Sequence, residues 1–241
     1  MKKNALMILF FLLLCIGGIV IILFLSNAIS MFGSISYQNN FSPVIVLDAG
    51  HGGFDSGAIG PDNVLEKDIN LSISLKLRDI LVINGYNVKM TRTTDTGTES
   101  SDAKTIRQKK NTDIKNRKKL IDQNSGGIFV SIHQNMFSES QYYGSQVFYS
   151  GNNEGSKFLA DYLQKQLVTM LQPENKRLTK RATNDIYLLY NANKETPSVM
   201  VECGFLSNKQ EAEKLVNEEY QKKLAIAIFS GITLFLYGNS E

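Results

Sequence analysis

Two apolar runs, each followed closely by a histidine, most constrain how this chain can fold. Residues 44–47 (Val-Ile-Val-Leu) are β-branched or aliphatic, and the run stops at the glycine-rich turn of residues 50–53, which contains His51. His133, the other of only two histidines in 241 residues, directly follows a similar run over residues 127–132. Short apolar runs of this kind are typical of strands buried on both faces, as in parallel sheets. Because ligands bind at the carboxyl edge of such sheets, we expect both histidines to lie at a binding site.

Helix and strand patterns alternate along the rest of the chain. This alternation predicts an α/β fold: a single domain with a mostly parallel, twisted sheet covered by helices on both faces, preceded by one N-terminal hydrophobic helix. A long polar loop over residues 92–112 has a length that favours a lid or a substrate-binding insertion. The expected strands are residues 44–49, 86–91, 127–132, 146–149 and 197–201, and the expected helices are residues 67–83, 114–122, 154–171, 209–217 and 220–237.

The N-terminal segment is typical of membrane targeting. Residues 1–4 (Met-Lys-Lys-Asn) precede an uncharged apolar stretch over residues 5–25, and about 20 apolar residues suffice to cross a bilayer as a helix. The two lysines favour the cytoplasmic side, so we expect residues 26–43 to form a polar linker and residues 44–241 an exported domain. Both an uncleaved transmembrane anchor and a signal sequence cleaved near residue 28 remain open.

Cysteine content and charge argue against a disulfide-stabilised domain and against a nucleic-acid-binding protein. Cys15 falls in the apolar stretch and only Cys203 lies in the expected domain, so the domain has no disulfide framework. The net charge is +3, with basic residues concentrated over residues 104–119; this segment suits either an anionic neighbourhood such as wall polymer or lipid head groups, or a solvated helix face. Because it lacks interleaved aromatic residues and recognition motifs, no nucleic-acid partner is expected.

The strand ends bring a possible metal site together. His51, His133 and Glu66, which stands at the start of the first expected helix, are a ligand set that catalytic zinc uses, with a fourth position left for water. Glu202, after the last expected strand, would be a second carboxylate able to take a proton from that water. Spacing alone leaves open that Glu66 is only a favourable charge at a helix N-terminus and Glu202 a surface carboxylate. A dinucleotide-binding loop is excluded because Asp55 replaces the third glycine.

Four segments carry a resemblance to a known family. The blocks Leu47-Asp48-Ala49-Gly50-His51-Gly52-Gly53, Glu66-Lys67-Asp68-Ile69-Asn70-Leu71, Ser131-Ile132-His133-Gln134-Asn135 and Val201-Glu202-Cys203-Gly204-Phe205-Leu206-Ser207-Asn208 resemble, in order, the signature blocks of zinc-dependent N-acetylmuramoyl-L-alanine amidases of the amidase-3 type. The resemblance implies one Zn²⁺ per chain held by His51, Glu66 and His133, with Glu202 as the catalytic glutamate. It implies hydrolysis of the amide between the lactyl group of N-acetylmuramic acid and the L-alanine of the peptidoglycan stem peptide.

The resemblance also implies further contacts and a setting. Arg92 and Asn135 are expected to contact substrate, and Arg117 matches another family arginine with a role in structure or substrate contact. The arrangement of hydrophobic segment and single domain is similar to the spore-cortex, germination-specific amidases of the CwlD type. That similarity implies a location outside the cytoplasmic membrane, in the forespore intermembrane space or cortex, formation of muramic-δ-lactam, and an activating protein partner as an open question. Departures from the family at Gln134, Met136 and residues 121–122 bear on substrate preference.

Two other functions remain open at this point. A non-catalytic peptidoglycan-binding module with a retained metal site would have the same blocks. A thiol hydrolase would use Cys203 with a histidine; however, neighbouring side chains on an extended segment point to opposite faces, so Cys203 and Glu202 should not share one cleft. A buried cysteine that packs as a small apolar side chain is the simpler interpretation.

Overall fold

The computed structural model describes residues 17–19, 21 and 43–238, in two compact units, Met1–Ser42 and Pro43–Glu241. In the first unit the described residues are helical. None of the helices among the described residues is long and apolar enough to span a membrane. The hydrophobic segment predicted over residues 5–25 and the linker predicted over residues 26–43 lie outside the described residues, except for residues 17–19, 21 and 43.

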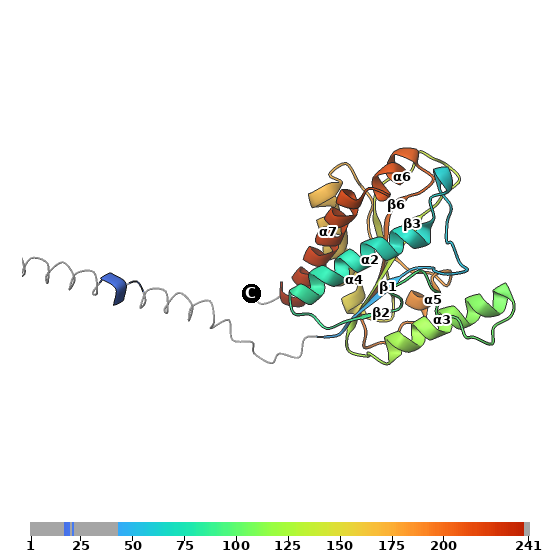
Figure 1. The fold of residues 1–241 in the computed structure, drawn as a ribbon, viewed down its shortest axis with the longest axis horizontal. Coiled ribbons are helices and arrows are strands. Elements are labelled where there is room, and N and C mark those ends of the chain that lie inside the picture. Colours follow the sequence, from blue (N-terminus) through green and yellow to red (C-terminus); the bar gives the residue numbers. More distant parts are fainter. Residues whose placement is uncertain (1–16, 20, 22–42, 239–241) are drawn as a thin grey trace, which may run out of the picture. The chain divides into compact units, whose positions relative to one another are not determined.

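The second unit is built on one six-stranded sheet (Figure 1). Its strand order is β2-β1-β3-β6-β4-β5. All neighbouring strands are parallel except β4 and β6, which are antiparallel. The prediction of an α/β fold with a mostly parallel sheet is therefore confirmed. The strands are β1 (Ile45–Ala49), β2 (Val88–Met90), β3 (Ile128–Asn135), β4 (Gln146–Tyr149), β5 (Lys180–Arg181) and β6 (Ser198–Phe205).

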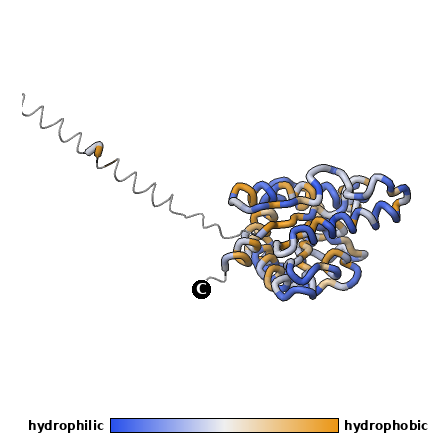
Figure 2. Tube along the Cα trace, turned by 90° about the horizontal axis from the view of Figure 1, so that it is seen from below, coloured by the Kyte–Doolittle hydropathy of each residue, from blue (hydrophilic) through white to orange (hydrophobic). Residues whose placement is uncertain are grey.

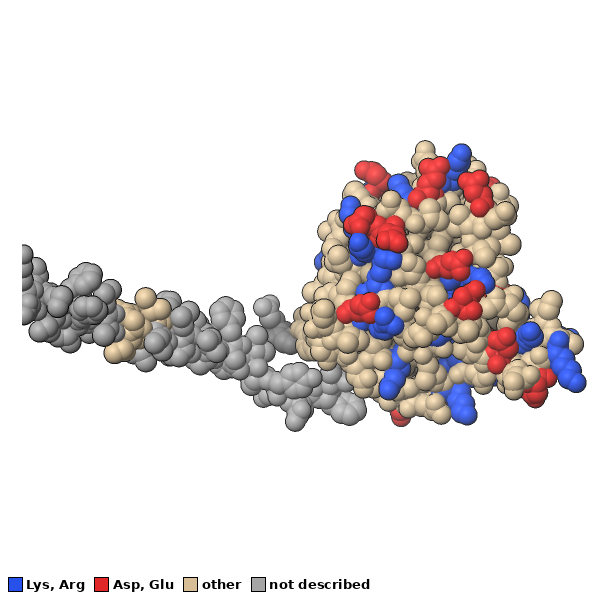
Figure 3. Space-filling view, in the orientation of Figure 1, with Lys and Arg blue, Asp and Glu red and all other residues tan. Residues whose placement is uncertain are grey.

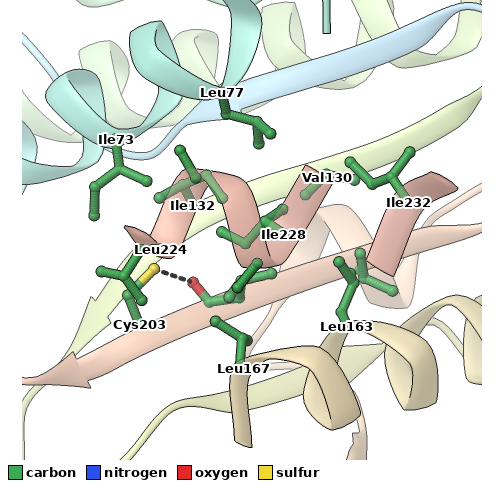
Figure 4. Packing of buried hydrophobic residues seen from close by; sticks show 14 of the residues in the cluster. Ile73, Leu77, Val130, Ile132, Leu163, Leu167, Cys203, Leu224, Ile228 and Ile232 are labelled. Carbon is green, nitrogen blue, oxygen red and sulfur yellow. Dashed lines mark hydrogen bonds between the residues drawn. The ribbon is translucent and has the colours of Figure 1, made fainter. Parts of the chain in front are cut away.

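Helices cover both faces of this sheet, as predicted (Figure 1). The helices are α2 (Glu66–Ile83), α3 (Ile106–Asp122), α4 (Glu154–Leu171), α5 (Tyr187–Tyr190), α6 (Lys209–Leu215) and α7 (Glu218–Tyr237), with a 3₁₀ turn, η1, at Pro61–Asn63. The larger core lies under α2, α4 and α7, where Ile73, Leu163 and Ile228 meet the strands (Figure 4). The smaller core lies under α3 and α5. Figure 2 shows the hydrophobic segments gathered inside the domain and hydrophilic ones around it.

The long loop is shorter than predicted because α3 begins at Ile106 and not near residue 114. A capping box starts the helix: the Thr105 hydroxyl accepts from Gln108 N–H at 3.2 Å, and Gln108 Oε1 accepts from Thr105 N–H at 3.0 Å. Such reciprocal bonds satisfy amides that the first helical turn leaves free. The first turns of α3 are polar and solvent-exposed, so they show no apolar stripe to indicate a helix.

The basic segment of residues 104–119 is mainly the exposed face of α3. Lys118 pairs with Asp122, Lys110 with Asp55 and Arg117 with Asp48. Basic and acidic side chains are interspersed over the face shown in Figure 3. The Lys118 and Lys110 pairs fit the solvated-helix interpretation of the segment, whereas Arg117 is buried and does not belong to the exposed face.

Strands β3 and β6 run further than predicted. His133 and Glu202 therefore lie inside these strands and not beyond their ends. The two residues are register partners on neighbouring parallel strands, and the pairing shifts between His133 and Asn135. Irregular pairing of this kind re-aims side chains and is common beside active sites. The register places Glu202 next to His133.

Candidate metal centre

The structure brings the three predicted ligands together at the carboxyl edge of the sheet. His51 lies in the turn after β1, Glu66 is the first residue of α2 and His133 lies in β3. Their ligand atoms all lie within 4.8 Å of one another. Two imidazoles and one carboxylate are the donor set of many catalytic zinc sites, which keep a further position open.

A neighbouring carboxylate orients His51. The backbone of His51 has φ 61°, a left-handed conformation that residues other than glycine rarely adopt. Its Nδ1 lies 2.8 Å from Asp55 Oδ2, which leaves Nε2 facing Glu66 Oε2 at 3.3 Å. Burial opposes protonation of His51, but hydrogen bonds to Asp55 and Glu66 raise its pKa to about 9. Histidines that bind a metal through one ring nitrogen commonly donate a hydrogen bond from the other ring N–H to a carboxylate. Sequence reasoning missed this role of Asp55, although the residue stands in the same glycine-rich turn.

Glu66 is buried and held in its ionised form. Its Oε1 lies 3.0 Å from His133 Nδ1 and accepts from Gln134 N–H, and its Oε2 accepts from Ala58 N–H at 2.8 Å. Burial would raise the pKa of this carboxyl, but His133 and His51 hold it well below its usual range. A metal ligand must be deprotonated, so this environment suits the role.

Two glycines let the ligands approach one another. A Cβ on Gly50 would overlap the His133 ring. A Cβ on Gly57 would lie 2.6 Å from Glu66 Oε2 and 2.7 Å from His51 Cδ2, and its φ of +66° also disfavours other residues. The ligand cluster therefore needs glycine at both positions, and this cradle fits a small ion held by three side chains.

Glu202 supplies a carboxylate beside the ligand set. Its Oε2 is buried and has no hydrogen-bond partner among the described residues. Burial raises the pKa of Glu202 to about 7, with nearby His133 opposing the shift. A buried polar atom left without a partner indicates a missing ligand or a catalytic role. A carboxylate with a pKa near neutrality is suited to general acid and base catalysis.

The two expected substrate contacts lie in different surroundings. Arg92 is only 4% exposed and donates to the backbone carbonyls of Ala49, Gly50, Lys67 and Thr94. These contacts show that Arg92 supports the turn that carries His51 from within, and they leave it almost no surface for the expected substrate contact. Asn135 is half-buried, and its side-chain amide makes no hydrogen bond to any described residue. A substrate contact by Asn135 stays a prediction.

Arg117 holds the turn that presents His51. Its Nη1 donates to Asp48 Oδ1 at 2.6 Å and to Ala49 O at 2.9 Å, and its Nη2 donates to His51 O at 2.7 Å. Nε donates to Asp113 Oδ2 at 2.7 Å. Burial would raise the pKa of Asp48, but Arg117 and His133 lower it to about 2. The structural alternative for Arg117 is thus the one that these contacts support.

The Asp48 pair predicts a specific loss of stability in acid. Because the pKa of Asp48 is lower in the folded chain, its stabilisation is present above pH 5 and is lost as pH falls toward 2. A shift of this size corresponds to about 2 kcal/mol. The free energy of unfolding of the wild type, measured in urea, should exceed that of Asp48→Asn by the largest amount at pH 6. This difference between wild type and variant should shrink by about 2 kcal/mol at pH 2. A gap that is constant with pH would contradict the assignment.

A cavity of about 550 Å³ adjoins the ligand cluster. It passes His51 and His133 and continues between α3 and α5, where Ile114, Tyr187 and Leu188 line it. A cavity of this size can hold part of a large substrate. Because it opens onto His51 and His133 of the ligand cluster, we regard it as part of the same site.

Cys203 lies outside the site. It is fully buried, belongs to the larger core and packs among Leu224 and Leu167 (Figure 4). Burial raises the pKa of its thiol, which disfavours the nucleophilic thiolate. The thiol-hydrolase alternative is wrong because the Cys203 side chain faces the core.

Comparison with known proteins agrees with this geometry. Residues 45–234 match the N-acetylmuramoyl-L-alanine amidase family of the amidase-3 type. The chain is 38% identical over 189 residues to the germination-specific N-acetylmuramoyl-L-alanine amidase of Bacillus subtilis (strain 168), covering 78% of each chain. It is similar to the solved CwlD amidase of Clostridioides difficile in complex with the GerS lipoprotein, at 45% identity and TM-score 0.78, covering 82% of this chain and 100% of that one.

A further solved relative is AmiC2 of Nostoc punctiforme, at 28% identity and TM-score 0.68, covering 81% of this chain and 97% of that one. The family match spans most of the chain, and the B. subtilis and C. difficile relatives are matched over most of their own lengths. The protein therefore belongs to the N-acetylmuramoyl-L-alanine amidase family and is an enzyme that acts on peptidoglycan.

Proposed function

We propose that this amidase is zinc-dependent and uses one Zn²⁺ held by His51, Glu66 and His133. The observation that carries the proposal is the cluster of three ligand atoms within 4.8 Å. The partnerless carboxylate oxygen of Glu202 supports it from the neighbouring strand. The scissile bond is the amide between the lactyl group of N-acetylmuramic acid and the L-alanine of the stem peptide.

The chain's own residues handle the protons. When bound, zinc supplies Lewis-acid chemistry by polarising the substrate carbonyl and lowering the pKa of water. Glu202 takes a proton from the attacking water and returns one to the nitrogen of the departing L-alanine, so the carboxylate is regenerated and the peptide leaves as a neutral amine. Asp55 and Arg117 keep His51 in its strained turn throughout.

We also propose a setting for the reaction. In this proposal residues 1–4 stay in the cytoplasm, residues 5–25 anchor or export the chain, residues 26–43 link, and residues 44–241 are the catalytic domain outside the membrane. The B. subtilis relative is germination-specific and the C. difficile relative forms a complex with a lipoprotein. These relatives support action on spore cortex, toward muramic-δ-lactam, with help from a protein partner.

Peptidoglycan digestion with controlled metal content tests this function. Residues 43–241, the unit that contains the site, should be examined together with the full chain. We expect about one zinc per chain, release of stem peptides beginning with L-alanine, loss of release after chelation and recovery on zinc addition. Liquid chromatography with mass spectrometry would identify the new N-terminus.

The outcomes separate the parts of the proposal. Release that persists in the metal-free protein would overturn zinc dependence. Glycan fragments released without free L-alanine would overturn the bond assignment. Cortex and vegetative peptidoglycan, compared at equal muramic acid content, test the cortex proposal: equal rates on both would contradict it.

A further inference from the structure

A second, cationic position lies along the sheet from Glu202. Arg177, in the segment before β5, is half-buried, and its guanidinium carbon lies 4.4 Å from the ring centroid of Phe205 and 5.8 Å from that of Tyr142. Nε donates to Tyr143 O at 2.8 Å and Nη1 donates to Gln146 Oε1 at 3.3 Å. Stacking on aromatic faces and two hydrogen bonds fix this guanidinium before any ligand arrives.

The charge of Arg177 is only partly balanced within the part of the chain that the structure describes, by the buried carboxyl of Glu211 nearby. No carboxylate forms an ion pair with it there. Arg117, by contrast, pairs with two aspartates, and Arg92 is sealed among backbone carbonyls. Arg177 also lines an open cavity of about 280 Å³ with Lys176, Tyr142 and Tyr143. A positioned, accessible and unpaired guanidinium is suited to bind a carboxylate.

The surrounding loop is built to keep this arrangement. Buried Glu211 accepts hydrogen bonds from Phe205 N–H at 2.8 Å and from Gly144 N–H at 3.0 Å. The end of β6 and the turn before β4 are thereby tied to one carboxylate. Both segments contact Arg177, one through Tyr143 O and the other through the Phe205 ring.

Register connects Arg177 with the catalytic residue. Gln146 on β4 is the antiparallel partner of Glu202 on β6, so both side chains point to the same face of the sheet. Neighbouring strands lie about 4.8 Å apart. The row His133, Glu202, Gln146, Arg177 therefore leads away from the metal ligands on the side of Glu202.

We propose that Arg177 binds the carboxylate of the stem-peptide residue that follows L-alanine. Glu202 protonates the departing amine, so the peptide must extend from the Glu202 side of the site. The lactyl carboxyl is consumed in the scissile amide, so the substrate's free carboxylates belong to its peptide. Two extended residues span about 7 Å. This length is comparable with the path from Glu202 to Arg177, which consists of one strand spacing of about 4.8 Å and the 3.3 Å hydrogen bond from Arg177 to Gln146. The muramoyl half then occupies the cavity beside His51, between α3 and α5.

This inference rests on the proposed amidase function, and its test separates the two. Soluble glycan fragments carrying L-alanyl-D-glutamyl stems should be prepared with both glutamyl carboxyls either free or converted to carboxamides. For the zinc-loaded enzyme, kcat/KM should be about 10- to 100-fold higher for the acid, as for a charge-assisted hydrogen bond. In Arg177→Gln this acid-to-amide ratio should fall to near one, mainly through KM for the acid.

Matched variants exclude a structural explanation. Arg177→Lys should keep part of the preference because it keeps the charge without the planar fork. Arg181→Gln, a change of an exposed arginine on β5, should keep the wild-type ratio. Thermal melting of each variant measures folding separately from the ratio. A wild type without acid preference, or an Arg177→Gln variant that retains it, would overturn the inference. A wild type that cleaves neither these fragments nor peptidoglycan would instead overturn the proposed function.

Discussion

Glu202→Gln should retain about one zinc per chain while its kcat for release of L-alanine-terminated peptides falls by about 10²- to 10⁴-fold, the usual contribution of a positioned general acid or base. The amide keeps the size of the side chain but cannot take a proton from water. Because Glu202 is not among the three clustered ligands, metal content should not change. Single-turnover rates on soluble peptidoglycan fragments, with zinc measured by mass spectrometry, check both parts.

A carboxylate elsewhere provides the control for this result. Glu213 is exposed on α6, so Glu213→Gln should show wild-type turnover and zinc content. Full turnover by purified Glu202→Gln would show that another group moves the protons. Loss of zinc together with activity would show that Glu202 holds the metal and does not act only as a base.

His133→Ala should lose both zinc and activity. The change removes one of three donors, and since altering a residue that merely supports a ligand costs about 10- to 100-fold in metal affinity, loss of a ligand should cost at least about 100-fold. Turnover should fall to the level of the chelated wild type. Equilibrium dialysis against a zinc buffer gives the affinity, and the peptidoglycan assay gives the activity.

Asn135→Ala is the matched control for His133→Ala. Asn135 lies two residues further along β3 and is not part of the ligand cluster. This variant should bind zinc as the wild type does, whatever its effect on substrate binding. If His133→Ala still binds one zinc tightly, the ligand assignment is wrong. Circular dichroism of the metal-free proteins would show whether folding differs.

Sequence patterns predicted the strands better than their ends. Apolar runs around residues 44–49 and 127–132 identify buried strands, because a strand in a sheet covered by helices on both faces needs apolar side chains on both sides. Polar residues that continue such a strand for functional reasons break the pattern. Strands β3 and β6 therefore appeared to end before His133 and Glu202, although hydrogen bonding carries both strands past these residues.

The prediction missed the first turns of α3 for a related reason. Residues 106–113 are held by the Thr105 capping box and by contacts at the helix base, and not by an apolar stripe. A hydrophobic period cannot report a helix that does not bury that part of its surface. The capping residues were a signal that could have located the start of α3.

What the sequence by itself determined is the chemistry of this protein. Most of the fold elements, though not the short β5 and α5, follow from local patterns, and the residue types His51, Glu66, His133 and Glu202 follow from those patterns and from resemblance. What only the tertiary structure decided is which partners those residues have. Three contacts show this: Asp55 with His51, Arg117 with the backbone of His51, and Arg177 with Gln146. They depend on strand register and on side chains brought together by the fold. Such contacts are set by packing of the whole sheet, and no local period or motif contains them.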